Sequence, residues 1–159
     1  MSVRSRKIGR MAMRKRVSRL HAVQALFQME VTGLDAAEAT ECFVAHGVGR
    51  QVDDMELSGF DEEHLRKLVV GAATNQDQLD ELAANLLSRD WPLQRIDPTL
   101  RALIRAAGAE LLLGSTPPRV TISEFVEVAD SFFPGGRQVS LINAILDKMA
   151  RNLQPAAFD

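Results

Sequence analysis

The chain has 159 residues, 46% of them hydrophobic and 25% charged, and a net charge of −2, which is an ordinary balance for one globular domain with its own core. Its single cysteine excludes an intrachain disulfide and fits a reducing compartment, and no apolar run approaches the ~18–20 residues that a membrane span needs. These bounds predict a cytoplasmic protein without a secretory signal, because no continuous apolar stretch follows the basic start of the chain.

The first twenty residues are strongly basic. They hold eight basic and no acidic side chains, whereas the rest of the chain holds 11 basic and 21 acidic ones. This asymmetry predicts a polyanionic partner for the N-terminal region. An organelle transit peptide or a membrane-surface helix would also be basic and amphipathic. Against both, the apolar face that begins at Leu20 continues into the first predicted helix, and its loss would deplete a small core.

A cationic ridge is predicted within this basic region. Lys15 and Arg19 are four residues apart and Arg16 and Arg19 are three apart, so on a helix they share one side. Each arginine fork matches the oxygens of a phosphate. If the helix begins near Met13, the cations also lie at its positive end, which is unfavourable unless an anion binds there. RNA is the polyanion that this arginine-rich pattern favours.

Apolar residues at helical spacing recur through most of the remaining chain. The predicted helices are one that ends at Gly33, one from about Asp35 to His46, one from Asp61 to about Thr74, one through Leu79 and Leu86, one from Pro98 to Gly114, one from Thr121 to Phe133, and one through Val139 and Leu153. Residues 47–60 lack a period and are predicted to be a loop. The result is an all-α, single-domain, compact bundle of about seven helices over residues 13–155, preceded by a basic arm, residues 1–12, whose order the sequence leaves open.

Two of these helices carry capping signals. Asp97 suits an N-cap and Pro98 the first helical position, where the missing N–H of proline costs nothing. Thr121 and Glu124 have the spacing of a capping box, which predicts that a helix begins at Thr121.

No constellation for catalysis or metal binding is present. The sequence lacks a phosphate-binding loop, a dinucleotide fingerprint and a zinc-protease motif. Its three histidines are scattered, and although Cys42 and His46 are four residues apart, two ligands do not make a zinc site. The sequence therefore predicts a non-enzymatic binding protein with no metal and no cofactor.

Five segments carry a resemblance to a known family. The segments AVQALFQ, VVGAATNQDQLD, IRAAGAELL, PPRVTISEFVEVADSFF and LINAILDKMARNLQP together resemble the NusB family of transcription antitermination factors, in that family's order and spacing. The resemblance implies an all-α RNA-binding fold. It also implies binding to boxA elements of nascent ribosomal RNA together with the small-subunit ribosomal protein NusE, and action on the elongating RNA polymerase.

The resemblance also implies an RNA site. The family's arginine-rich segment falls on Lys15, Arg16 and Arg19, with Arg14 as a neighbour. A second RNA-contacting region departs from the family: residues 140–144 replace the usual Lys-Phe-Val-Asn-Gly, and Arg137 stands where an acidic loop is common. Arg137 restores positive charge, but the lost aromatic removes a stacking contact worth ~1–3 kcal/mol. RNA preference is therefore expected to differ from that of typical members.

A NusE-facing surface is implied at Phe27, where the family usually has tyrosine, and at Asp97. From the residues alone, Phe27 fits equally well in the core and Asp97 is an N-cap. Arg105 and Glu110 match the same family segment and are expected to form internal structural pairs or solvated helix charges. Two alternatives stay open: a protein-interaction module of this fold with weak RNA binding, and either a monomer or a homodimer.

Overall fold

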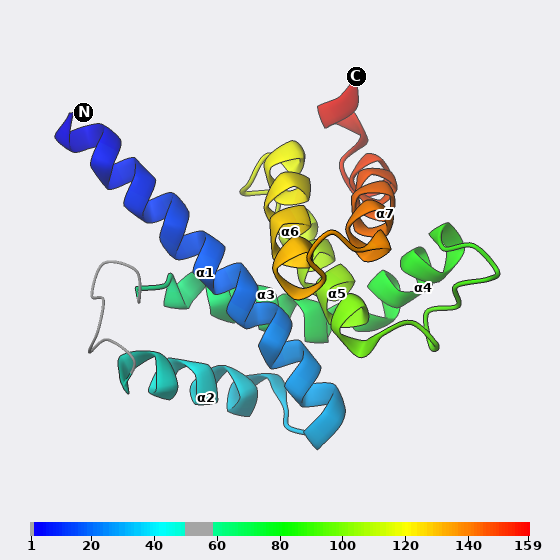
Figure 1. The fold of residues 1–159 in the computed structure, drawn as a ribbon, viewed down its shortest axis with the longest axis horizontal. Coiled ribbons are helices and arrows are strands. Elements are labelled where there is room, and N and C mark those ends of the chain that lie inside the picture. Colours follow the sequence, from blue (N-terminus) through cyan, green and yellow to red (C-terminus); the bar gives the residue numbers. More distant parts are fainter. Residues whose placement is uncertain (1, 50–58) are drawn as a thin grey trace.

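The computed structural model describes residues 2–49 and 59–159 of the chain. Within these ranges it contains seven α-helices, a C-terminal 3₁₀ turn and no strand (Figure 1), which confirms the predicted all-α fold. The helices are α1 (Val3–Thr32), α2 (Ala36–Gly49), α3 (Glu62–Thr74), α4 (Gln76–Leu86), α5 (Pro98–Leu113), α6 (Pro118–Phe132) and α7 (Arg137–Leu153), followed by η1 (Pro155–Phe158). None of the described helices is both long enough and apolar enough to cross a membrane.

Helix α5 lies at the centre of the bundle. It packs against α1 and α3 on one side and against α4, α6 and α7 on the other, as Figure 1 shows. Between Leu100 and Leu111 every α5 residue except Arg101 and Arg105 is buried. A helix that is apolar nearly all round is stable only when other helices cover all its sides, so the composition of α5 accounts for its central place.

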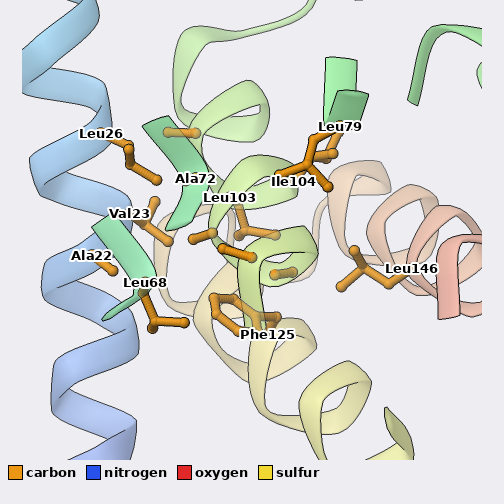
Figure 2. Close-up of a cluster of buried hydrophobic side chains, with 14 of the residues drawn as sticks. Ala22, Val23, Leu26, Leu68, Ala72, Leu79, Leu103, Ile104, Phe125 and Leu146 are labelled. Carbon is orange, nitrogen blue, oxygen red and sulfur yellow. The ribbon is translucent and has the colours of Figure 1, made fainter. Parts of the chain in front are cut away.

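The core is aliphatic and rich in alanine. Side chains from all seven described helices contribute to it, and Figure 2 shows among them Val23 of α1, Leu68 of α3 and Phe125 of α6. Small residues allow close approach of the helices: a Cβ on Gly108 of α5 would lie 2.7 Å from Cδ2 of Leu79 on α4. Aliphatic side chains and small-residue contacts thus replace the aromatic packing that this composition lacks.

Most predicted helix ends are confirmed. Gly33 and Gly114 follow α1 and α5 in the left-handed conformation, with φ of 80° and 70°, which glycine adopts without strain. Asp97 caps α5 by accepting a hydrogen bond from the Thr99 amide at 2.7 Å. The interruption predicted around residues 74–76 separates α3 from α4.

The predicted start of the first helix is wrong. The helix α1 begins at Val3, capped by Ser2, and runs for 30 residues, about 45 Å. The basic residues 14–19 therefore lie in the body of the helix, and the macrodipole acts only within the first turn. The positive end of the α1 dipole is therefore too far from residues 14–19 to repel their charges, and it gives no reason for an anion to bind there.

The capping box predicted at Thr121 is also wrong. The helix α6 begins at Pro118, with Pro117 at the N-cap and the Thr121 amide already bonded to the Pro117 carbonyl at 3.1 Å. Proline at the first position starts a helix because its φ is already helical. Thr121 and Glu124 are consequently inside the helix, and their side chains are used for tertiary contacts.

The helix α2 continues to Gly49, so the first three residues of the predicted 47–60 loop are helical. Residues 50–58, most of that loop, lie outside the described part of the chain.

Candidate nucleic-acid interface

The predicted RNA-binding cations do not all lie on one side of α1. The Arg14 guanidinium donates a hydrogen bond from Nη2 to the Phe60 carbonyl at 3.0 Å, on the side where α3 begins. Arg16 instead reaches α6. Residues two apart on a helix are turned by about 200°, so Arg14 and Arg16 flank α1 on nearly opposite sides. Lys15 lies between them, half-buried.

Arg16 is held by a carboxylate of α6. Its Nε and Nη2 donate to Oε2 and Oε1 of Glu124 at 2.8 and 3.1 Å, a two-pronged pair. The Arg16 side chain is nevertheless 50% exposed, whereas that of Glu124 is 16% exposed. The hydrogen bond and charge of Glu124, with a smaller contribution from Glu127, raise the pKa of Arg16 above its ordinary value.

Arg19 points into the protein, contrary to its predicted role as a phosphate contact. Its side chain is 4% exposed; Nε donates to Oε1 of Glu110 at 2.8 Å, and Nη1 lies 3.7 Å from Oε2 of Glu124. Arg19 lies three residues after Arg16, so its side chain points in another direction. The Arg19 guanidinium contacts α5, whereas that of Arg16 lies at the surface. Arg19 therefore ties α1 to α5 and does not present its charge to solvent.

Glu110 of α5 is the centre of a buried polar cluster that joins four helices. Besides Arg19, its carboxylate accepts a hydrogen bond from Oγ1 of Thr121 at 2.6 Å, and Nε2 of His64 lies 2.6 Å from Oε1. Burial alone would raise the pKa of Glu110. The hydrogen bonds from His64, Thr121 and Arg19 and the charge of Arg19 outweigh burial and hold that pKa below its ordinary value. The expected structural role of Glu110 is thus confirmed.

This lowered pKa predicts that the fold is weakened by acid. The ionised Glu110 stabilises the folded state fully above the unfolded-state pKa of about 4.3, and that contribution is lost as the pH falls through the lower folded-state pKa. Urea unfolding at pH 7 and pH 3 should show a smaller loss of stability in Glu110→Gln than in the parent chain. An equal acid-dependent loss in both proteins would contradict the assignment.

The remaining predicted RNA residue, Arg137, is exposed at the first position of α7. Within residues 2–49 and 59–159, no ion pair links Arg137 or Lys15 to a carboxylate. The described contacts also include no hydrogen bond between Arg137 and α1, so the structure leaves it as a separate cation.

Phe27 and Asp97, the predicted partner residues, lie on elements that meet at one end of the bundle. Phe27 is 37% exposed and is therefore not a core residue. Asp97 is exposed at the cap of α5. One turn beyond each, Glu30 of α1 and Arg101 of α5 form a two-pronged ion pair that ties the two helices together.

A groove of about 650 Å³ opens beside this ion pair, between α1, α4, α5 and the segment before α5. Arg105 is one of the residues that line it, and it pairs with Asp80 at 2.8 Å and with Glu30 at 3.2 Å. Its walls include the apolar side chains of Leu26 and Leu93. Sequence reasoning missed this groove. The sequence feature that could have indicated it is the pair Arg101 and Arg105, four residues apart in an otherwise apolar helix.

Metal binding is not supported by the described residues, since no three His, Cys, Asp or Glu side chains among them come together as a possible site. Cys42 is half-buried on α2.

Comparisons with known proteins agree with this fold. A family model described as the NusB family matches residues 16–151. The transcription antitermination protein NusB of Maricaulis maris (strain MCS10) is 40% identical over 145 residues, covering 91% of this chain and 90% of that protein. The NusB protein of Nitrobacter hamburgensis (strain DSM 10229 / NCIMB 13809 / X14) is 38% identical over 152 residues, covering 95% and 94%.

Solved structures give the same result. T. maritima NusB superimposes with a TM-score of 0.68 at 27% identity, covering 90% of this chain and 95% of that one. A complex of the antitermination factors NusB and NusE with dsRNA contains a chain that matches with a TM-score of 0.69 at 20% identity, covering 89% and 98%. At that identity the second match is a likeness of fold alone.

Proposed function

The chain belongs to the NusB family, and on that premise we propose that it is a non-enzymatic, RNA-binding transcription antitermination factor. It binds boxA-like elements of nascent ribosomal RNA together with the ribosomal protein NusE, and it acts on the elongating RNA polymerase in the cytoplasm. Relatives named as antitermination proteins, 38–40% identical over most of this chain, support this proposal.

The observation that carries the RNA part is the exposed basic stretch in the middle of α1. Arg14, Lys15 and Arg16 contact phosphates from both flanks of the helix, and Arg19 holds this stretch to the core through Glu110. Arg137 adds charge at a second position. Phosphate contacts give affinity without sequence information, so this set accounts for binding to RNA more directly than for selection of one sequence.

The NusE-binding part rests on Phe27, Asp97 and the adjacent groove. An exposed aromatic ring on the helix that also lines a groove with both apolar and charged side chains suits a protein interface, in which aromatic residues and arginine are enriched. The same surface favours a second candidate function, in which NusE binding dominates and RNA binding is weak.

Titration of a labelled boxA-like RNA, with and without NusE, at 50 and 200 mM salt tests the proposal. We expect binding that weakens with salt and strengthens when NusE is present. RNA binding that ignores salt would contradict the role of the α1 cations. NusE binding without detectable RNA binding would favour the second candidate function.

Asp97 serves as a cap and, in this proposal, as a partner contact, and two variants separate the roles. Asp97→Ala should lower the free energy of unfolding by about 1 kcal/mol through loss of the Thr99 hydrogen bond, whereas Asp97→Asn keeps a capping acceptor and should leave stability nearly unchanged. Both should weaken NusE binding about fivefold, because an exposed ion pair contributes up to ~1 kcal/mol. Calorimetric titration and thermal melts measure the two effects.

The matched control is Asp90→Asn, which removes an exposed carboxylate from the segment before α5. NusE affinity that is unchanged in Asp97→Asn, or reduced equally in the control, would remove Asp97 from the interface.

A further inference from the structure

Among the proposed phosphate contacts, Arg16 is already paired with an anionic side chain, that of Glu124. Both carboxylate oxygens of Glu124 accept hydrogen bonds from one edge of the guanidinium, Nε and Nη2, at 2.8 and 3.1 Å. Arginine uses the same forked geometry for phosphate. Glu124 therefore occupies, in the RNA-free chain, an edge of Arg16 that a phosphate would use.

The other basic residues of this stretch differ. Arg14 bonds a neutral carbonyl, and within the described ranges Lys15 has no carboxylate partner in hydrogen-bonding or ion-pair distance. Arg16 alone of the three is paired with a glutamate, and a second glutamate one turn further along α6, Glu127, adds to the negative potential around it.

We propose that Glu124 and RNA compete for Arg16, so that Glu124 sets the RNA affinity of the basic stretch of α1. This inference rests on the proposed RNA-binding function. A phosphate on the free edge of Arg16 would lie beside the Glu124 carboxylate and be repelled by it, whereas a phosphate on the forked edge must displace that carboxylate. In either position Glu124 weakens binding.

The surroundings of Glu124 make the exchange feasible. Its side chain is mostly buried, and a buried carboxylate left without a partner would be costly. Arg19 prevents that cost: its Nη1 is 3.7 Å from Glu124, and its position is held by Glu110. When Arg16, which is half exposed, turns toward RNA, Glu124 retains the charge of Arg19.

The experiment compares the full-length chain with Glu124→Gln, using a fluorescein-labelled single-stranded boxA-like RNA at several salt concentrations. Glutamine keeps the size of the side chain but removes the charge. We expect Glu124→Gln to bind RNA about threefold to fivefold more tightly, the range given by a partly exposed ion pair. The slope of log affinity against log salt should change by less than about 0.7, the value for one phosphate contact, because Arg16 already counts as a contact in the parent chain.

The matched control is Glu127→Gln, which removes a nearby charge that makes no hydrogen bond to Arg16; its gain should be smaller. In an Arg16→Ala background, Glu124→Gln should change affinity less than twofold. If Glu124→Gln is poorly folded by circular dichroism, Glu124→Asp replaces it, since the shorter side chain cannot keep both hydrogen bonds and should give a smaller gain in affinity.

Weaker or unchanged RNA binding by a folded Glu124 variant would overturn the competition, and so would an equal gain in the Arg16→Ala background. Those results would leave the proposed function intact as long as the parent chain binds RNA. Failure of the parent chain to bind RNA would overturn both.

Discussion

Replacing Glu110 with alanine is expected to lower the free energy of unfolding by about 3–5 kcal/mol. The Glu110 side chain is fully buried and accepts hydrogen bonds from Arg19 at 2.8 Å and Thr121 at 2.6 Å, with His64 also at 2.6 Å. Its removal leaves the Arg19 guanidinium buried with only the longer contact to Glu124. The large effect comes from an uncompensated charge more than from a lost hydrogen bond.

Urea unfolding followed by circular dichroism measures this change. Thr121→Val is the control, because it removes one hydrogen bond from the same carboxylate and leaves the charge pair in place; it should cost about 1–3 kcal/mol. A loss below about 1 kcal/mol in Glu110→Ala would contradict the view that the cluster holds α1, α3, α5 and α6 together.

Replacing Arg14, Lys15 and Arg16 together with alanine is expected to remove most of the salt-dependent RNA binding. Each phosphate contact with a single strand contributes about 0.7 to the slope of log affinity against log salt. These three contacts contribute about −2 to the slope, so between 50 and 200 mM salt the affinity of the parent chain should fall about 20-fold more than that of the triple variant. Filter binding at both salt concentrations measures the slope.

The slope also tests the burial of Arg19. Counted as a further contact, Arg19 would add about 0.7 to the slope that remains in the triple variant; its side chain is 4% exposed and paired with Glu110, so it should not contribute. The control for the triple variant is Lys67→Ala with Lys148→Ala, two exposed lysines on α3 and α7. An equal loss of affinity in this control would show that RNA binding depends on the net charge of the protein and not on the basic stretch of α1.

Local signals in the sequence predicted most of the fold. Helical spacing of apolar residues identified the seven helices found in residues 2–49 and 59–159, and Asp97, Gly33 and Gly114 marked ends that the structure confirms. These signals suffice because capping and chain reversal depend on neighbouring residues. The two wrong starts have local causes as well: residues 3–12 of α1 hold only four apolar residues among four basic ones, too few to predict a buried helical face, and a capping-box pattern in α6 competed with the Pro117–Pro118 start.

The candidate site was predicted only in part. Residue type and the family resemblance selected the basic stretch of α1 and the partner residues Phe27 and Asp97. They could not tell that Arg14 contacts the segment before α3 and that Arg16 contacts α6, because the phase of a helix relative to its neighbours comes from packing. Nor could they find the groove beside Glu30, whose walls come from segments far apart in the chain.

The sequence by itself determined that this is an all-α chain of the NusB family with a basic stretch in its first helix, since spacing, caps and charge are properties of neighbouring residues. Only the tertiary structure decided how each cation is used. Arg19 is 91 residues from Glu110 and Arg16 is 108 residues from Glu124, and both pairs exist because α5 and α6 pack against α1. Burial and an opposite charge turn one arginine into a structural residue and place another in competition for RNA.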